Sequence, residues 1–327
     1  MKALVTGGAG FIGSHLCEAL IAQGDQVFVL DDLSTGRFEN IEYIKGLTCV
    51  IDSTLNQQIV RDLVREVDVV YHLAATVGVQ LVVNEPIRTI VNNIRGTETV
   101  LEETCRYRRN LLITSTSEVY GKGMRKVFHE GDDAVIGPTT RTRWCYAASK
   151  AIDEFLALAY WYEKRHPVII VRLFNTVGPR QTGRYGMVIP RFVSQAVRNE
   201  PLTVYGDGKQ TRCFAYVGDV VPALKGLMAR PDLSGEVFNI GTTESVTMED
   251  LARRVIERTG SASKIAYIPY DQVYGPGYED MRHRAPSLDK IKNAIGYQPK
   301  TSLDQILDAV IDDVRKRMAA APQEPVC

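Results

Sequence analysis

Short apolar runs alternate with amphipathic stretches through the first half of the chain. The apolar runs occupy residues 2–6, 26–30, 47–51, 67–73, 111–115 and 168–173. Between them, apolar side chains recur at helical spacing over residues 12–23, 57–64, 87–106 and 146–164. Strands that are apolar on both faces and alternate with helices are typical of a parallel sheet covered by helices on both sides. The pattern therefore predicts an α/β fold with a doubly wound parallel sheet.

The pattern changes after about residue 175. Prolines and glycines cluster in residues 178–190, 201–208 and 269–277, and shorter helical patterns cover residues 188–198, 217–228, 248–259 and 303–317. We expect a doubly wound domain over residues 1–175 and a smaller, ligand-binding α/β part over residues 176–327. No linker separates the two, so we expect them to interleave and to share one sheet.

Composition and charge exclude several classes of protein. Apolar residues make up 45% of the chain and charged residues 24%, which is typical of a globular protein and not of a disordered one. The 39 basic and 39 acidic residues cancel, which argues against a dedicated nucleic-acid binder. No apolar run approaches the roughly 18 residues of a membrane helix, and no signal peptide precedes the first strand pattern. The six cysteines lie far apart, so we expect a cytoplasmic protein with no metal site.

A glycine-rich turn follows the first predicted strand. Gly7, Gly10 and Gly13 form a GxxGxxG pattern, and Phe11 and Ile12 open the helix within it. The first glycine permits a tight turn, the second lets backbone approach a pyrophosphate, and the third allows close packing of helix on strand. The helix N-terminus adds free N–H groups and a positive dipole end. Strand, turn and helix together predict a dinucleotide-binding site.

Acidic residues end the next two predicted strands. Asp31 and Asp32 follow the second strand, at the distance from the glycines where a carboxylate accepts hydrogen bonds from both ribose hydroxyls. Such a carboxylate repels a 2′-phosphate and favours NAD over NADP, although nearby Arg37 could accommodate that phosphate. Asp52, after the third strand, either bonds the adenine amino group or is a turn residue.

A tyrosine and a lysine four residues apart lie on one face of the predicted helix 146–164. We expect the ammonium of Lys150 to favour the phenolate of Tyr146 and so lower its pKa. The tyrosine can then remove a hydroxyl proton while a nicotinamide takes the hydride from the same carbon. Thr116, just past another strand, can hydrogen-bond the same substrate oxygen.

Together these residues make the chain resemble the extended short-chain dehydrogenase/reductase superfamily, in the branch of NAD-dependent nucleotide-sugar epimerases and dehydratases. The likeness spans nearly the whole chain and includes Gly7/Gly10/Gly13, Asp31, His72-Leu73-Ala74-Ala75, Asn93, Gly96-Thr97, Thr116, Tyr146/Lys150, Arg172-Leu173-Phe174-Asn175, Gly178-Pro179-Arg180, Thr203-Val204-Tyr205-Gly206-Asp207-Gly208 and Gln210-Thr211-Arg212.

The resemblance implies roles for individual residues. It implies a Rossmann NAD-binding domain over residues 1–175, a mainly nucleotide-sugar-binding part over 176–327, and catalysis by Thr116, Tyr146 and Lys150, with Lys150 on the nicotinamide ribose. The implied NAD contacts are Gly7, Gly10, Phe11, Ile12, Gly13, Asp31, Asp32, Asp52, Leu73, Ala74, Ala75, Asn93, Tyr146 and Lys150. The implied substrate contacts are Asn175, Arg191, Thr203, Tyr205, Arg212, Tyr278 and Arg284.

Three features resemble the UDP-glucuronate decarboxylases within this superfamily. They are Ser117-Glu118 after Thr116, Arg143-Trp144 before Cys145-Tyr146, and the segment 274–286 with Tyr278 and Arg284. They imply oxidation of UDP-glucuronate at C4 and loss of CO₂ from the resulting ketone. Water, or an acid near Glu118 or Arg284, then protonates C5. The product is a UDP-4-keto-pentose or UDP-xylose.

Two alternatives stay open. Residues 76–80 read Thr-Val-Gly-Val-Gln, where decarboxylases of this group carry a tyrosine, and residues 178–187 also differ from the usual decarboxylase loop. These departures resemble a UDP-sugar 4-epimerase acting on UDP-glucose or UDP-glucuronate. A non-catalytic sensor of NAD or nucleotide sugar is the remaining alternative.

The helical patterns at 87–106 and 146–164 have broad apolar faces. The resemblance implies a homodimer in which two such helices from each subunit form a four-helix interface. Packing of these faces within the subunit's own core is the alternative.

Overall fold

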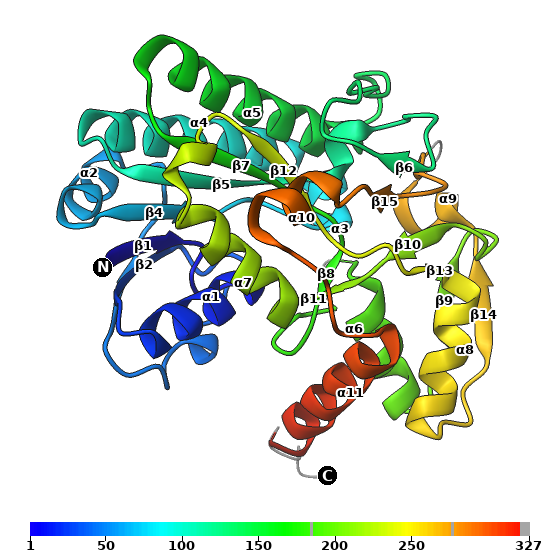
Figure 1. The fold of residues 1–327 in the computed structure, drawn as a ribbon. Coiled ribbons are helices and arrows are strands. Elements are labelled where there is room, and N and C mark those ends of the chain that lie inside the picture. The colour runs from blue at the N-terminus through cyan, green and yellow to red at the C-terminus, as the bar shows by residue number, and fades with distance from the viewer. Residues whose placement is uncertain (184–185, 276–277, 321–327) are drawn as a thin grey trace.

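A seven-stranded parallel sheet forms the centre of the molecule in the computed structural model, which describes residues 1–183, 186–275 and 278–320 (Figure 1). The strand order is β12-β7-β5-β4-β1-β2-β3. In chain order the strands are β1 (Lys2–Thr6), β2 (Gln26–Asp31), β3 (Leu47–Ile51), β4 (Val69–His72), β5 (Asn110–Thr116), β7 (Val168–Leu173) and β12 (Val237–Ile240). This order, which reverses beside β1, confirms the predicted doubly wound α/β fold.

Helices cover both faces of the sheet. One face holds α1 (Phe11–Ala22), α7 (Val217–Met228) and α10 (Asp289–Ile295), and the other holds α2 (Gln57–Glu66), α4 (Pro86–Arg106) and α5 (Trp144–Lys164). Alternation along β1 produces these two cores, since Ala3 and Val5 pack toward α1 and Leu4 packs on the opposite face. Burial of apolar surface stabilises each helix layer by about 25 cal/mol per Å². The sheet held between the two layers provides the strand ends at which the site lies.

One strand of the sheet was not predicted from the sequence. β12 is only four residues long and pairs in parallel with β7, register Val237 to Ile170. Its polar Asn239 interrupts the apolar pattern, yet this side chain is buried because Tyr120 and Phe128 satisfy it by hydrogen bonds. The second segment thus contributes a strand to the shared sheet, whereas the division at residue 175 stays a prediction.

The smaller part packs three helices against short strand pairs. The helices are α6 (Val188–Val197), α8 (Met248–Thr259) and α11 (Leu303–Ala320), and their apolar faces form a separate core. The strands are β9 (Leu202–Tyr205) with β14 (Ile265–Ile268), β10 (Thr211–Cys213) with β13 (Ser245–Thr247), β8 (Thr176–Val177) with β11 (Ala215–Tyr216), and β6 (Val127–Phe128) with β15 (Ala285–Pro286). Two short helices, α3 (Val79–Asn84) and α9 (Tyr270–Tyr274), and three 3-10 helices, η1 (Phe38–Asn40), η2 (Ser117–Tyr120) and η3 (Pro231–Leu233), complete the described elements.

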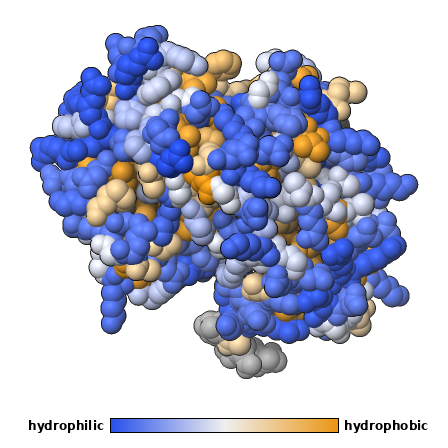
Figure 2. All heavy atoms as spheres, viewed as in Figure 1, coloured by the Kyte–Doolittle hydropathy of each residue, from blue (hydrophilic) through white to orange (hydrophobic). Residues whose placement is uncertain are grey.

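The outer surface is mixed in polarity. On the face seen in Figure 2 hydrophilic residues predominate, and apolar residues show in small separate groups. None of the helices in the described ranges is long and apolar enough to cross a membrane. Within the same ranges, no group of three or more His, Cys, Asp or Glu side chains could hold a metal ion.

Candidate active site

A cavity of about 460 Å³ runs along the carboxyl ends of the sheet strands. One end is lined by the glycine turn after β1 and by Asp31 at the end of β2, and the other by Arg212 of β10 and Arg284 beside β15. Tyr146 and the end of β5 lie along the cavity between them. Ligands of open α/β sheets bind at this edge, where the strand order reverses. The volume is in the range of small-molecule sites.

The glycine turn leaves no room for a side chain. Gly7 has a φ of +72°, and a Cβ there would lie 2.8 Å from the backbone nitrogen of Ala74. Gly10 precedes the first residue of α1, so the free N–H groups of that helix end face this turn. A turn that a Cβ would fill, at a helix N-terminus, fits the pyrophosphate of a dinucleotide. Phe11, Ile12 and Gly13 line the cavity with it.

Asp31 is a buried acceptor at the edge of this turn. Its two carboxylate oxygens accept hydrogen bonds from the N–H groups of Ala9 and Leu33, each at 2.9 Å, and burial raises its pKa. A Cβ on Gly36 would lie 2.7 Å from the carboxylate, so the glycine leaves it room. Asp32 also lines the cavity. The geometry fits ribose hydroxyls on Asp31.

The contacts of Arg37 and Asp52 bear on the two interpretations left open for these residues. Arg37 lines the cavity, and its Nε lies 3.5 Å from Oε2 of Glu39. This carboxylate offsets the positive charge with which Arg37 would bind a 2′-phosphate. Asp52 lines the cavity too, and it accepts hydrogen bonds from Ser53 at 2.6 Å and Asn56 at 2.9 Å. The turn role of Asp52 is therefore seen, and its adenine contact stays a prediction.

The loop after β4 is fixed from behind by α4. Leu73, Ala74 and Ala75 line the cavity. The buried Asn93 side chain accepts the N–H of Thr76 at 2.8 Å and donates to Ser149 of α5 at 3.2 Å. Asn93 is not among the described residues that line the cavity, so the structure gives it a positioning role. Its contact with NAD stays a prediction.

Tyr146 and Thr116 meet at the cavity wall. Both side chains are buried, and both line the cavity. Burial raises the pKa of Tyr146 above its usual value, and the hydrogen bond with the Thr116 side chain lowers it in part. The expected net lowering of this pKa is therefore wrong for the protein alone, because removal of the phenol from water outweighs the groups that favour phenolate.

Lys150 has a partner that the sequence interpretation did not give it. Its Nζ donates to the carboxylate of Asp153 at 2.7 Å, and both side chains are buried. Lys150 is not among the described residues lining the cavity, so its contact with the nicotinamide ribose stays a prediction.

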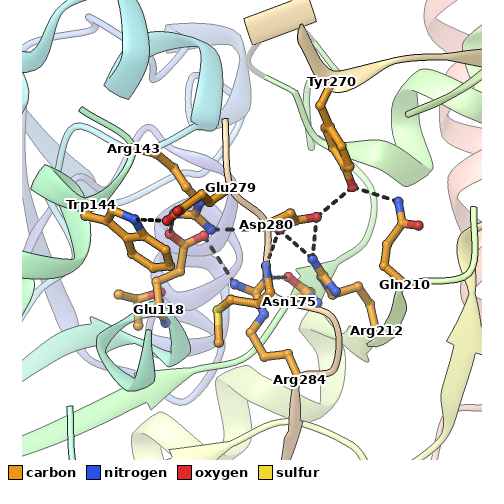
Figure 3. Close-up of polar contacts among 12 residues, drawn as sticks. Glu118, Arg143, Trp144, Asn175, Gln210, Arg212, Tyr270, Glu279, Asp280 and Arg284 are labelled. Atoms are coloured by element: carbon orange, nitrogen blue, oxygen red, sulfur yellow. Dashed lines mark hydrogen bonds and ion pairs between the residues drawn. The ribbon is translucent and has the colours of Figure 1, made fainter. Parts of the chain in front are cut away.

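Glu118 lies between two arginines (Figure 3). It belongs to the 3-10 turn Ser117–Tyr120, directly after β5. Arg143 Nη1 donates to one carboxylate oxygen at 2.6 Å, and Arg284 Nη1 donates to the other at 3.2 Å. These two guanidinium groups outweigh the effect of burial and lower the pKa of Glu118 to about 2. Glu118 is therefore ionised at neutral pH.

Arg212 is paired in the same region. Its Nη2 donates to both oxygens of Asp280 at 2.8 Å, and the hydroxyl of Tyr270 donates to the same carboxylate at 2.9 Å (Figure 3). Arg284 also donates to the side chain of Asn175. We refer to Glu118, Arg143, Arg212, Asp280 and Arg284 as the charge cluster. All five line the cavity.

Aromatic rings surround the remaining predicted substrate residues. The Arg191 guanidinium lies 3.8 Å from the centre of the Tyr205 ring, and Tyr278 stacks on Tyr274 with ring centres 4.4 Å apart. Arg191, Tyr205 and Tyr278 line the cavity. The Thr203 hydroxyl instead bonds Gln195, and Thr203 is not among the described lining residues.

Two members of the charge cluster, Arg143 and Asp280, were not predicted as site residues from the sequence. Arg143 belongs to the Arg143-Trp144 pattern, which carries the resemblance but implies no role for the arginine itself. Its place three residues before Tyr146 could have shown that it enters the site with that tyrosine. Asp280 lies in the segment 274–286, where the resemblance implies roles only for Tyr278 and Arg284 and not for this carboxylate.

Comparison with known proteins agrees with this geometry. Residues 3–241 match the NAD dependent epimerase/dehydratase family. The chain belongs to this family, and NAD is the cofactor that its glycine turn and Asp31 fit.

Curated relatives cover almost the whole chain. It is 40% identical over 317 residues to a UDP-N-acetyl-alpha-D-glucosaminuronate decarboxylase of Bacillus cytotoxicus, covering 96% of this chain and 98% of the relative. It is 37% identical over 318 residues to UDP-glucuronic acid decarboxylase 4 of Arabidopsis thaliana, covering 97% and 69%.

Solved structures share the fold. A UDP-glucose 4-epimerase of Thermotoga maritima, solved with UDP-glucose, is 31% identical with a TM-score of 0.88, covering 97% of this chain and 100% of its own. A UDP-glucuronic acid 4-epimerase of Bacillus cereus, solved with UDP-glucuronic acid and NAD, is 29% identical with a TM-score of 0.86 and the same coverage.

Proposed function

We propose that the protein is an NAD-dependent UDP-glucuronate decarboxylase. The observation that carries this proposal is the ionised Glu118 held between Arg143 and Arg284 beside Tyr146, because two buried cations at the reacting end of a cavity suit an anionic sugar. The curated relatives named above, which are decarboxylases of UDP-linked uronic acids, support the same conclusion.

The first step is proton removal at C4. The glycine turn and Asp31 would hold NAD, and the chemistry that bound NAD would supply is acceptance of the C4 hydride and its later return. Tyr146 takes the proton of the C4 hydroxyl, and the Thr116 hydroxyl hydrogen-bonds the same oxygen. Burial raises the pKa of Tyr146, and Arg284 lowers it in part. We expect Lys150 to act as a second cation that favours the phenolate. Lys150 provides its charge from within α5, four residues from the tyrosine.

Oxidation at C4 prepares the loss of CO₂. The carboxylate on C5 is then β to a ketone, so the C5–C6 bond breaks and its electron pair moves to the C4 oxygen as an enolate. The protonated Tyr146 and Thr116 stabilise that oxygen by hydrogen bonds. C5 next takes a proton. Glu118 does not supply it, because its pKa of about 2 leaves it without a proton at neutral pH. Water in the cavity fills this role, and Glu118 holds the arginines.

A substrate panel tests the proposal. The purified protein is incubated with NAD and with UDP-glucuronate, UDP-glucose or UDP-galactose, and the nucleotide-sugar products are identified by mass. We expect UDP-glucuronate alone to lose the mass of CO₂. An unchanged mass with a new C4 epimer would instead establish the 4-epimerase, which shares the oxidation step and which the structural neighbours favour.

The substituent at C2 of the sugar defines a second candidate. The 40% identity to a decarboxylase of the N-acetylated uronate favours UDP-N-acetylglucosaminuronate as an additional substrate. Both substrates have the same carboxylate and C4 hydroxyl, so the chemistry is unchanged. Comparison of kcat/KM for the two substrates decides between them.

We also propose a cytoplasmic homodimer. Ile87 of α4 is 78% exposed and Phe155 of α5 is 71% exposed, while Val100 and Leu101 of α4 are buried in the subunit's own core. The helices therefore use one face for the core and leave apolar side chains on another, as a four-helix interface requires. A solution mass of one chain, 36.4 kDa, at micromolar concentration would contradict the dimer. Cell fractionation tests the location.

A further inference from the structure

Glu279 is an acidic residue for which the steps above need no role. Its Oε2 atom accepts a hydrogen bond from the indole Nε1 of Trp144 at 2.9 Å (Figure 3) and lies 2.6 Å from Nζ of Lys122. Trp144 is the first residue of α5, two residues before Tyr146, and Lys122 follows the 3-10 helix η2. The contacts with Lys122 and Trp144 hold the pKa of the Glu279 carboxyl below its usual value, so this group is ionised at neutral pH.

The two residues beside Glu279 in the chain belong to the cavity wall. Tyr278 and Asp280 line the cavity, and the Asp280 carboxylate accepts hydrogen bonds from Arg212 and from the hydroxyl of Tyr270. Glu279 itself is not among the described lining residues, and its side chain is 34% exposed. Its contacts therefore lie behind the wall and join the segment that carries Tyr278 and Asp280 to the start of α5.

The indole of Trp144 is a fixed point for this contact. Trp144 is 2% exposed, and a buried indole N–H needs a hydrogen-bond acceptor, which Glu279 provides. A Cβ on Gly137 would lie 2.1 Å from Nε1, so the chain packs closely beside this nitrogen. The ring centre also lies 4.8 Å from the Arg143 guanidinium and 5.8 Å from the Lys122 ammonium. The half-exposed ion pair with Lys122 contributes little alone, so the bond to the indole sets the place of Glu279.

We propose that Glu279 is a positioning residue that, through Trp144, joins the nucleotide-sugar end of the cavity to the helix that carries Tyr146. The contact fixes Tyr278 and Asp280 at the cavity wall before a ligand arrives, so binding costs less in the ordering of this segment. The inference rests on the proposed function only in taking the ligand at this end of the cavity to be a UDP-sugar. It does not depend on which reaction follows the oxidation at C4.

Calorimetry with UDP and with NAD tests the inference. UDP is common to all the nucleotide sugars considered above, and its binding needs no turnover. Glu279→Ala should weaken UDP by about three- to tenfold, the value of one partly exposed hydrogen bond to a charged group. The Kd of NAD should not change, because the glycine turn and Asp31 lie at the other end of the cavity. Glu236→Ala is the matched control and should change neither Kd, since Glu236 forms a similar exposed pair with Lys290 at 2.7 Å and does not line the cavity.

Two further variants test whether Glu279 acts through the indole. Glu279→Gln keeps an oxygen that can accept the indole N–H and loses only the charge, so it should weaken UDP by less than about threefold. Trp144→Phe keeps an aromatic ring and removes the N–H. Combined with Glu279→Ala, it should weaken UDP no more than Glu279→Ala does alone, because both changes remove the same bond. Additive losses in the double variant would overturn the inference.

The fluorescence of Trp144 reports the contact in solution. The chain has two tryptophans, Trp144 and Trp161, so Trp161→Phe leaves Trp144 as the only one that emits. In that background Glu279→Ala should move the emission to longer wavelength and increase its quenching by acrylamide, because the indole loses its cover. Unchanged emission, an unchanged Kd of UDP, or equal weakening of UDP and NAD would overturn the inference. Absence of CO₂ release from UDP-glucuronate by the unmodified protein would overturn the proposed function alone, since the two Kd values do not depend on it.

Discussion

Lys150 and Asp153, three residues apart on α5, form an ion pair that is almost entirely buried, with Nζ and Oδ2 2.7 Å apart. The Asp153 carboxylate neutralises the Lys150 ammonium, and it contributes to raising the pKa of Tyr146. Burial has the largest effect on the pKa of Tyr146 and raises it; Glu118 and Asp153 also raise this pKa, and Thr116 and Arg284 lower it. Asp153 is a positioning residue in this arrangement.

Replacement of Asp153 should change the pH dependence of oxidation. In Asp153→Asn, Lys150 keeps its place but loses its counter-charge, so the pKa of Tyr146 falls and the rising limb of kcat moves to lower pH. The measurement is the initial rate of NADH formation across pH 6 to 10. Glu163→Gln, exposed on the same helix, is the control. An unshifted limb in Asp153→Asn would assign the ion pair to stability alone.

Tyr146→Phe should abolish every reaction, including transient NADH formation. The Tyr146 hydroxyl is hydrogen-bonded to the Thr116 side chain at the cavity wall. Phenylalanine lacks this hydroxyl, so the proton of the C4 hydroxyl loses its acceptor. Positioned proton transfer is worth about 10²–10⁴-fold, so stopped-flow absorbance at 340 nm resolves the loss easily. Normal NADH formation by this variant would mean that another group is the base.

Glu118→Gln should separate oxidation from decarboxylation. The neutral amide cannot balance Arg143 and Arg284, so these two cations lose their place beside the reacting sugar. We expect the variant still to reduce NAD⁺ with substrate but to release CO₂ at least about tenfold more slowly, because the reacting groups are misplaced. Simultaneous recording of NADH and CO₂ checks this. Equal losses in both signals would show that the glutamate only stabilises the fold.

The Glu118 carboxylate should also make the stability of the fold depend on pH in the acid range. Its folded pKa of about 2 lies below the unfolded value near 4.5, so its contribution is fully present above pH about 4.5 and is lost as pH falls toward 2. The difference in Tm between the unmodified protein and Glu118→Gln should therefore shrink on going from pH 5 to pH 3. A constant difference over that interval would contradict the assigned pKa direction.

Asp31→Ala should weaken NAD and relax discrimination against NADP. The change removes the acceptor for the ribose hydroxyls and the charge that repels a 2′-phosphate. Fluorescence titration with both dinucleotides gives the ratio of their Kd values. Copurification of the unmodified protein with NADP would show that the end of β2 has been misinterpreted.

Local patterns predicted most of the fold and one half of the site. The glycine turn, Asp31 and Tyr146 each follow from a strand or helix end, so spacing alone places them. Arg284, which pairs with Glu118, lies 166 residues away along the chain. Spacing cannot predict such a pair, because it depends on how β6 and β15 bring distant segments together. Asp153 was within reach, since its i, i+3 spacing from Lys150 puts the two on one helix face.

The most direct test of the account follows the carboxyl carbon. UDP-glucuronate labelled with ¹³C at C6 is incubated with the protein and NAD, and ¹³CO₂ is measured against the nucleotide sugar consumed. The account predicts one ¹³CO₂ for each UDP-glucuronate consumed and a product that is a UDP-pentose or its 4-ketone. Consumption of UDP-glucuronate with all ¹³C retained in a C4 epimer would contradict it.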